Sequence, residues 1–249
     1  MGYLTGFHAI EESIRARAAA GLESGPLLLA KAGPRAREIV ALATRQGIRL
    51  ERIGAHELDR IAPDNKGIAL LVEDSAPAAG PASVEEFLSG LGERESALAL
   101  ILDEITDPHN YGAILRSCDQ FGADVVISRN RRSAKNADAV AKTSAGASAW
   151  VAQAEAPNLV RALGQLKDAG FWVYAADPRG EPAHKVDLRG RVALALGAEG
   201  SGVSRLLAES CDGRVGIPSI GKIDSLNVSV AAGVLLYEAR RQRLTRGGA

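Results

Sequence analysis

The feature that most constrains the fold is a series of short, continuously apolar segments that alternate with helical patterns. Residues 97–102, for example, read Ala-Leu-Ala-Leu-Ile-Leu without a polar interruption. Strands buried on both faces have this character, and their alternation with helices is typical of a parallel sheet covered by helices on both sides. The expected strands span residues 97–102, 124–128, 171–175, 192–196 and 214–217, and the expected helices span residues 111–121, 158–169 and 226–243.

The N-terminal part of the chain has a smaller α/β pattern of its own. Residues 1–74 combine short apolar strands with two helical segments and are long enough for a small domain. Residues 75–83 contain two prolines and no large apolar side chain, which indicates a linker. The acidic residues 84–96 that follow are expected to form a solvated lead-in or a short helix; they extend the expected linker to residue 96, so the larger domain is expected over residues 97–249.

Composition excludes several classes of protein. The 249 residues include 30 basic and 30 acidic side chains, so nucleic-acid binding would have to use local patches. The two cysteines cannot form a disulfide scaffold, and there is no CxxC pair of the kind that binds zinc. No apolar run approaches the ~20 residues of a membrane span, and the first residues lack a secretory signal pattern. We therefore expect a cytoplasmic protein with no metal and no membrane association.

A first polar corner follows the strand at 97–102 and runs from Asp103 to Arg116. Ligands in open parallel sheets bind where strands give way to helices. Asn110 could serve there as a ligand contact or simply as the N-cap of the next helix. Arg116 stands off the apolar stripe of that helix, as either a functional cation or an ordinary surface arginine.

A second corner, Gly197-Ala198-Glu199-Gly200-Ser201-Gly202, follows the strand at 192–196. Its three glycines allow backbone to approach a ligand closely, but their spacing is neither that of a dinucleotide fingerprint nor that of a Walker loop. Glu199 is therefore either a solvated turn carboxylate or a functional group.

A third corner runs from Ile217 to Gly233 and joins the last strand to the last helix. Ser225 would serve as the N-cap of that helix. Asn227 and Ser229 are poor helix formers among apolar neighbours, and capping by Ser225 does not explain them.

Together the three corners resemble the SpoU (TrmH-type) branch of the SPOUT RNA ribose 2′-O-methyltransferases. Asp107–Arg116 resembles the first motif of that family, Leu196–Gly200 the second, and the segment from Ile217 to Ser229 the third. The resemblance covers about residues 98–244. More loosely, the N-terminal domain resembles the RNA-binding domain of RlmB-like 23S rRNA enzymes.

The resemblance implies a SPOUT-type sheet with a C-terminal trefoil knot, S-adenosylmethionine as methyl donor, and a homodimer with its active site near the subunit interface. One departure is Ser219, where relatives often have Met. The implied catalytic and substrate-positioning set is Asn110, Arg116, Glu199, Ser225 and Asn227, and the implied cofactor pocket is lined at Leu196, Gly197, Ile217 and Leu226.

In such enzymes the arginine of the first motif is thought to activate the ribose hydroxyl. Because a guanidinium stays protonated in proteins, Arg116 could instead stabilise the forming alkoxide and bind a phosphate. Asn110 could orient Arg116, and Glu199 could balance its charge.

A basic stretch after the strand at 124–128 is the expected RNA contact. A solvated surface run is the alternative explanation. Its cations are Arg129, Arg131, Arg132, Lys135 and Lys142.

The leading interpretation is methylation of a guanosine ribose in 23S rRNA. A tRNA ribose methyltransferase is the first alternative, although the separate N-terminal domain argues against it. A non-catalytic RNA-binding or ribosome assembly factor and a nicotinamide dehydrogenase are the others, disfavoured by the intact motifs and by the glycine spacing.

Overall fold

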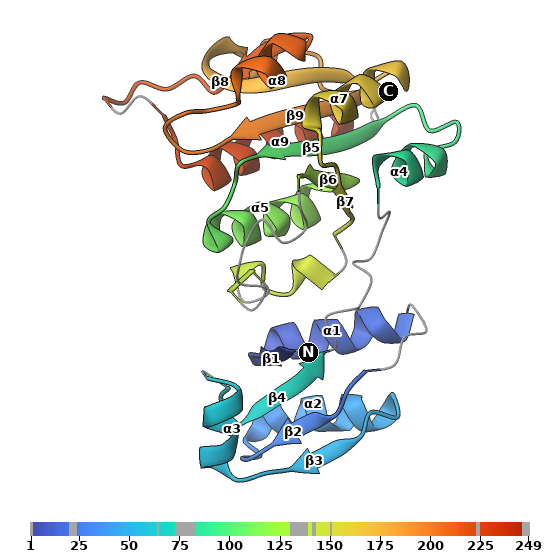
Figure 1. Cartoon of the computed structure of the whole chain (residues 1–249), viewed down its shortest axis with the longest axis vertical. Helices are drawn as coiled ribbons and strands as arrows, with labels where there is room; N and C mark the ends of the chain where they lie inside the picture. Colours follow the sequence, from blue (N-terminus) through green and yellow to red (C-terminus); the bar gives the residue numbers. More distant parts are fainter. Residues whose placement is uncertain are drawn as a thin grey trace.

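A computed structural model describes residues 2–19, 24–63, 65–72, 83–129, 139–140, 143–149, 151–222 and 225–245 of the chain. The protein has two parts that are stacked along its long axis, a small N-terminal domain and a larger C-terminal one (Figure 1). Each part has its own sheet, and the two sheets share no strand. No helix within the described residues has the length and apolar character that crossing a bilayer requires.

The small domain is a four-stranded sheet in the order β1-β4-β2-β3, in which β4 is antiparallel to its neighbours. Leu27 and Leu29 face the core beneath α1 and α2, while Leu28 between them packs toward α3. This alternation is the two-residue period of a strand covered on both faces. Its elements are β1 (Gly2–Thr5), α1 (Phe7–Ala19), β2 (Leu27–Leu29), α2 (Pro34–Arg45), β3 (Leu50–Arg52), α3 (Ala55–Ile61) and β4 (Ile68–Val72).

The large domain is built on a fully parallel six-stranded sheet in the order β10-β8-β9-β5-β6-β7, which confirms the expected parallel α/β architecture. Its central strand β5 is buried along its whole length. The strands are β5 (Ala97–Asp103), β6 (Val125–Ser128), β7 (Gln153–Glu155), β8 (Trp172–Pro182), β9 (Arg191–Gly197) and β10 (Gly213–Gly216).

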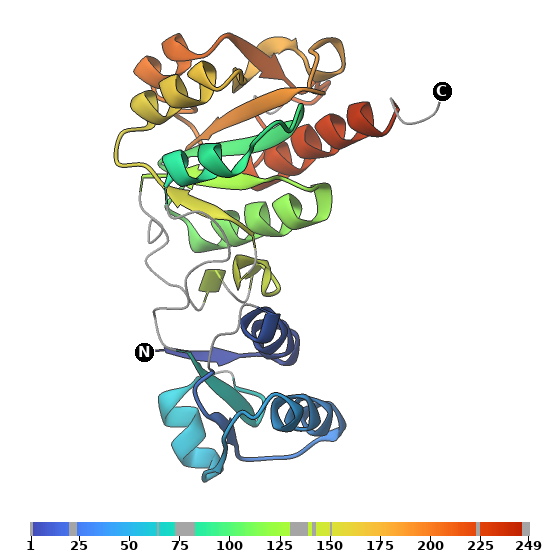
Figure 2. The same ribbon diagram turned by 90° about the vertical axis from the view of Figure 1, so that its right-hand side faces the viewer.

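Helices cover both faces of this sheet, as Figure 2 shows from the side. Leu98, Leu100 and Leu102 of β5 pack toward α5 and α9, whereas Ala99 and Ile101 pack toward α4, α7 and α8. The helices are α4 (Val84–Gly90), α5 (Pro108–Phe121), α7 (Leu159–Asp168), α8 (Arg205–Ser210) and α9 (Val228–Leu244), with short 3₁₀ turns η1 (Ala147–Ala149) and η2 (Ala183–Lys185).

The second half of the expected linker, residues 84–96, contains the short helix that was one of its two expected forms, and this helix belongs to the large domain. Helix α4 begins after Ser83, whose hydroxyl accepts a hydrogen bond from the Glu86 N–H. Val84 and Phe87 are buried in the core of the large domain, and Phe87 contacts Phe171 with ring centroids 6.2 Å apart. The large domain therefore begins at residue 83 in the structure, because two apolar side chains one turn apart are enough to fasten a short acidic helix to the sheet.

At the amino-terminal edge of the large sheet, long polar side chains donate hydrogen bonds to backbone carbonyls. Arg191 donates to the carbonyls of Gly92, Arg94 and Ala169 at 2.8–3.1 Å. Arg243, near the end of α9, donates to the carbonyls of Ala97, Leu188 and Gly190 at 2.9–3.2 Å.

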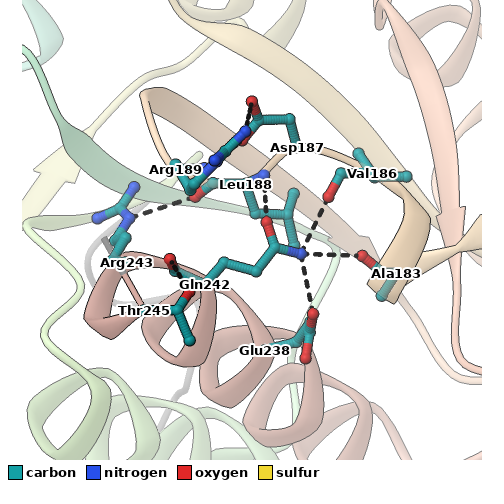
Figure 3. Close-up of polar contacts among 9 residues, drawn as sticks. All are labelled: Ala183, Val186, Asp187, Leu188, Arg189, Glu238, Gln242, Arg243 and Thr245. Carbon is teal, nitrogen blue, oxygen red and sulfur yellow. Dashed lines mark hydrogen bonds and ion pairs between the residues drawn. The ribbon is translucent and has the colours of Figure 1, made fainter. Parts of the chain in front are cut away.

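Gln242 adds four more hydrogen bonds at this edge (Figure 3). Its amide donates to the carbonyls of Ala183 and Val186 and to Glu238, and its oxygen accepts from the Leu188 N–H. The last turn of α9 is thereby fixed to the η2 segment, and the backbone carbonyls there are satisfied.

The carboxyl-terminal edge contains the point where the chain changes direction across the sheet. Strands β5 and β9 are adjacent, with Asp103 opposite Gly197, yet β5 continues to β6 on one side and β9 continues to β10 on the other. The loops after these two strands therefore diverge and leave a crevice between them, which is where open α/β sheets bind ligands.

Candidate active site

The crevice at the carboxyl edge contains three polar side chains that come from three distant segments. The Asn110 amide donates to Glu199 Oε1 at 3.1 Å. The Asn227 amide donates to the same Glu199 oxygen and to Asn110 Oδ1, the latter at 2.9 Å. One residue of each motif thus joins a closed network, which we call the amide–carboxylate cluster.

Asn110 is free to join this cluster because it does not cap α5. Asp107 is the N-cap, and its carboxylate accepts from the N–H groups of His109 and Asn110 at 3.2 Å. Pro108 at the first helical position fixes the start of the helix there. The interpretation of Asn110 as a cap was therefore wrong, and the Asp-Pro pair was the signal that places the cap three residues earlier.

Asn227 has a double role, and it replaces the N-cap expected at Ser225. Its Oδ1 accepts from the Ser229 N–H at 2.9 Å, the Ser229 hydroxyl at 2.6 Å and the Val230 N–H at 3.3 Å, so it is the N-cap of α9. Its amide group points the other way, into the cluster. Asn227 therefore caps α9 with its side-chain oxygen and joins the cluster with its side-chain nitrogen. These two sets of contacts hold the start of α9 beside Glu199.

A cavity of about 1050 Å³ opens beside the cluster. Its walls are the ends of β8 and β9, the loop after β9, the end of β10 and the start of α9. Glu199 and Ser225 are on its wall, as are all four residues expected to line the cofactor pocket, namely Leu196, Gly197, Ile217 and Leu226.

Glycine is required where the backbone segments around this cavity meet. A Cβ on Gly197 would lie 1.9 Å from the carbonyl carbon and oxygen of Gly202, so the loop can fold back over the strand end only without a side chain. A Cβ on Gly216 would lie 2.8 Å from the Asp177 carbonyl oxygen. The cavity wall is thus largely backbone, which presents N–H and C=O groups in fixed positions.

The segment after residue 175 is a part of the cavity that the sequence did not reveal. Strand β8 continues to Pro182, and residues Ala175–Arg179 line the cavity. Asp177 accepts from the Arg179 N–H at 2.9 Å and pairs with Arg214 at 2.7 Å, and these two contacts hold the pKa of its carboxyl below the usual value. A polar Asp-Pro-Arg-Gly stretch normally indicates a turn, so no apolar pattern marked this continuation.

Arg116 does not join the cluster in a single chain. It lies six residues after Asn110 on α5, which is about 240° around the axis and about 9 Å along it. Its side chain is exposed and forms no hydrogen bond or ion pair with the residues that the structure describes. The expectation that Asn110 orients Arg116 and that Glu199 balances its charge is therefore wrong within one protomer, because both groups bind each other and Asn227 instead.

Of the expected RNA-binding residues, the structure describes Arg129, at the end of β6. Its guanidinium lies 3.3 Å from the Asp103 carboxylate and 3.8 Å from that of Glu104. The other four expected contacts lie outside the described residues; they are Arg131, Arg132, Lys135 and Lys142.

The chain beyond those residues returns to the first turn of α5. A Cβ on Gly112 would lie 2.8 Å from Thr143 Cβ and 2.9 Å from the Val140 carbonyl oxygen, and Thr143 Oγ1 lies 3.3 Å from His109 Nδ1. Gly112 therefore admits this segment directly against the helix turn that carries Asn110.

Two sequence families match the chain. Residues 97–237 match the SpoU rRNA Methylase family, and residues 3–78 match the family described as RNA 2'-O ribose methyltransferase substrate binding. The chain belongs to the SpoU rRNA Methylase family. The two matches correspond to the large and small domains of the fold.

Curated relatives agree with this membership. The chain is 44% identical over 216 residues to the 23S rRNA (guanosine-2'-O-)-methyltransferase RlmB of Xanthomonas campestris, which covers 85% of each chain. It is 41% identical over 218 residues to an uncharacterized tRNA/rRNA methyltransferase of Borreliella burgdorferi, over 85% of this chain and 96% of that one.

Solved structures of this family have the same two-part fold. An RNA 2'-O ribose methyltransferase superposes with a TM-score of 0.77 at 27% identity, over 97% of this chain and 88% of that one. The SpoU methyltransferase AviRb from Streptomyces viridochromogenes, in complex with the cofactor AdoMet, superposes with a TM-score of 0.75 at 25% identity, over 98% and 90%.

Proposed function

We propose that this chain is a cytoplasmic methyltransferase that uses S-adenosylmethionine to methylate a ribose 2′-hydroxyl of guanosine in 23S rRNA. The amide–carboxylate cluster, whose Glu199 lies on the wall of the backbone-lined cavity, is the observation that carries the proposal. The curated relatives named for this reaction, such as the Xanthomonas enzyme, supply the substrate class.

The cavity suits S-adenosylmethionine in size and in chemistry. Ligand pockets for molecules of this kind measure roughly 300–1,000 Å³, and this cavity of about 1050 Å³ is slightly larger than the upper end of that range. Leu196, Ile217 and Leu226 offer apolar contacts for an adenine ring, and the neighbouring backbone offers its hydrogen bonds. Carboxylates and guanidinium groups on the same wall, such as Glu209 and Arg179, match an ammonium and a carboxylate. The chemistry supplied by the bound group is an electrophilic methyl on a positively charged sulfur.

The amide–carboxylate cluster is suited to hold the hydroxyl that accepts the methyl group. Both hydrogens of the Asn227 amide are used within the cluster, as is one hydrogen of Asn110. Within the described residues this leaves the second Asn110 N–H as a donor and Glu199 Oε2 as an acceptor. A hydroxyl that donates to Glu199 and accepts from Asn110 has a single orientation, and such positioning accounts for a large part of catalysis in a methyl transfer.

Ser225, the remaining member of the expected set, lies on the cavity wall and is exposed. We assign it a substrate-positioning role through its hydroxyl, which can donate and accept. It makes no contact with the described part of the cluster, so its contribution would come from contact with bound substrate.

We further propose a homodimer, because α9 has an apolar face that the described residues leave largely exposed. Val230, Val234 and Tyr237 recur at helical spacing and are each at least 40% exposed. Helix α5 packs beside α9, with the Phe121 and Tyr237 ring centroids 5.8 Å apart. A two-fold contact on this face would bring both α5 helices to the interface, where Arg116 could act on RNA bound across the two subunits.

The close backbone passages support a trefoil knot in the large domain. Between β9 and α9 the chain runs past the end of β8 so closely that Gly180 and Gly216 have no space for a side chain. A Cβ on Gly180 would lie 2.7 Å from Val215 backbone atoms. Such passages are expected where one segment threads through the loop formed by another.

Methyl transfer from labelled S-adenosylmethionine tests the function. The chain is incubated with unmodified 23S rRNA or with unmodified tRNA, and the labelled nucleotide is mapped by primer extension and nuclease digestion. We expect label on a guanosine ribose of 23S rRNA. Label in tRNA alone would overturn the substrate assignment, and label on a base would overturn the reaction assignment.

Sedimentation analysis of Val234→Glu tests the dimer. We expect wild-type chain to sediment as a dimer and the variant as a monomer, since the new carboxylate would lie in the apolar contact. Leu206→Glu on α8 is the matched control, because Leu206 is also an exposed apolar side chain but lies on another face. Dissociation by both variants, or by neither, would contradict the assignment of α9 as the interface.

A further inference from the structure

Three aspartates of the large domain accept a backbone N–H from a residue that is distant in the sequence, and they are built to the same design. In each, one carboxylate oxygen accepts a backbone N–H and the other pairs with a cation. Asp124 accepts from Leu98 N–H and pairs with Arg94, and Asp212 accepts from Val173 N–H and pairs with Lys167. Both lie at the amino edge of the sheet, far from the cavity, where they fasten neighbouring strands.

The third, Asp103, differs in position and in burial. It ends β5 at the carboxyl edge, opposite the cavity residue Gly197, and is only 1% exposed, compared with 18% for Asp124 and 16% for Asp212. Its Oδ2 accepts from the Ser204 N–H at 2.9 Å, and its Oδ1 accepts from Arg129 at 3.3 Å. A buried carboxylate is costly unless its partners are well fixed, so these two contacts are tightly specified.

The Ser204 contact determines where the loop after β9 ends. This loop begins at Gly197, whose strand is paired with the β5 backbone at Asp103, and it ends at Ser204, which is bonded to the Asp103 side chain. Glu199 lies between these two points. A single residue of β5 therefore fixes both ends of the loop that carries the carboxylate of the amide–carboxylate cluster.

The contact of Asp103 with Arg129 lies on the β6 side of the same sheet edge, away from the loop after β9. Arg129 is half exposed; its contact with Asp103 uses one of its five N–H donors, and its Nη1 lies 3.8 Å from the Glu104 carboxylate, so further donors remain for a phosphate. It is the first cation of the basic stretch, and Val140 and Thr143 lie against Gly112 in the helix turn that carries Asn110. An arginine held in place in this way loses less conformational entropy when it binds a phosphate.

We infer that Asp103 is a positioning residue that holds the Arg129 guanidinium in the orientation that binds an RNA phosphate, and at the same time fixes the exit of the Glu199 loop. The inference rests on the proposed function, because it requires RNA at this edge of the sheet. It distinguishes Asp103 from the two aspartates of the same design, which serve stability alone.

The direction in which one substitution changes the affinity for RNA distinguishes this positioning role from a purely electrostatic effect. Asp103→Asn removes a negative charge near the RNA, so a purely electrostatic effect would strengthen RNA binding. If Asp103 positions Arg129, the same substitution weakens binding, because an amide retains the bond to Ser204 N–H but no longer pairs with the guanidinium. The affinity for an unmodified 23S rRNA transcript is measured by filter binding over a range of salt concentrations.

We expect Arg129→Gln to lower that affinity by about 3- to 10-fold and to reduce the slope of log affinity against log salt by about one. Asp103→Asn should lower it by about 3-fold, and the double variant should bind no worse than Arg129→Gln alone, since residues that act as a unit are not additive. Affinity for S-adenosylmethionine, measured by calorimetry, should stay within about twofold for both single variants, whereas Asp103→Ala, which also frees Ser204, should lower it.

Asp124→Asn is the matched control and should leave both affinities unchanged. Unchanged or tighter RNA binding by Asp103→Asn, or additive effects in the double variant, would overturn the inference. If Asp103→Asn does not fold, unchanged binding by the surface variant Arg129→Gln overturns it equally. Methyl transfer by the wild-type chain is measured alongside, so that failure of the proposed function is seen separately as the absence of label in RNA.

Discussion

The two edges of the large sheet use similar side chains for opposite purposes. At the amino edge, Arg191 and Arg243 each donate to three backbone carbonyls, and Gln242 completes four hydrogen bonds. At the carboxyl edge, Asn110, Glu199 and Asn227 bind mainly one another, and Glu199 lies on the wall of a cavity. The side chains at the amino edge satisfy the hydrogen-bonding needs of backbone carbonyls, whereas those at the carboxyl edge keep polar atoms available for a ligand.

Helix α9 connects the two arrangements. It starts with Asn227 in the amide–carboxylate cluster and ends with Gln242 and Arg243 at the amino edge. Substitutions at its two ends should therefore have separable effects, on turnover at the first end and on folding stability at the second. The following predictions test that separation.

Glu199→Ala should have the largest effect. It removes the shared acceptor of both amides, and we expect turnover to fall by about 10²- to 10³-fold, the usual cost of losing a polar group that positions the reacting centre. Single-turnover methyl transfer measures this, and the melting temperature should stay the same. Glu93→Ala, an exposed glutamate at the amino edge, is the control. A large loss of stability in Glu199→Ala would break the separation of the two edges.

Arg116→Ala comes next, with turnover expected to fall about 100-fold, whether Arg116 stabilises the alkoxide or binds the adjacent phosphate. Affinity for S-adenosylmethionine should not change. Mixing this variant with Glu199→Ala sharpens the test, because a dimer with one intact site built from both chains would recover part of the activity. Near-native turnover of Arg116→Ala would remove Arg116 from the mechanism.

Arg243→Met tests the amino edge. It leaves the carbonyls of Ala97, Leu188 and Gly190 without their donor, and we expect a loss of about 2 kcal/mol in the free energy of unfolding. Urea titration measures the loss, and turnover per folded molecule should not change. The neighbouring Arg240 is exposed, and Arg240→Met should be neutral. Equal effects of both variants would mean that the hydrogen bonds to carbonyls contribute nothing measurable.

Acid should weaken the amino edge by a smaller amount through Glu238. Hydrogen bonds from Arg241 and Gln242 hold the pKa of the Glu238 carboxyl below its ordinary value despite partial burial. Its contribution is therefore present above the unfolded-state pKa of about 4.3 and is lost as the pH falls through the lower folded-state pKa. Relative to Glu238→Gln, wild type should be more stable by less than about 1 kcal/mol at pH 7, and the difference should shrink below about pH 5. A difference that grows in acid would reverse the assigned sign.

The sequence predicted the elements whose stability comes from apolar packing. Strands β5 and β9 and helix α7 lie within a residue or two of their expected positions, because their side chains alone mark them. The three-residue strand β7 and the distal half of β8 were missed, since backbone pairing to a neighbour creates them and their own residues are polar or small. The pattern of apolar residues in a sequence can reveal which segments are buried, but it cannot reveal which distant strand a segment pairs with.

The candidate site shows the same limit. Residue types and motif order brought Asn110, Glu199 and Asn227 together correctly as a group. Their hydrogen-bond partners were assigned wrongly, because Arg116 faces away from Asn110 on the helix and the capping roles belong to Asp107 and Asn227. Asp103 was missed because a carboxylate at a strand end has no distinguishing signal until its two partners are known.

The backbone contact between Gly197 and Gly202 limits how such an enzyme can be redirected to another RNA. The cavity wall cannot be reshaped by placing side chains at positions 197 and 216, because there is no volume for one, and the same is true at position 180 nearby. A laboratory library that seeks new target specificity would do best to hold these positions constant and to diversify the small domain and the basic stretch after β6. In this architecture, one part of the polypeptide retains the methyl-transfer chemistry while other parts can change to recognise a new target.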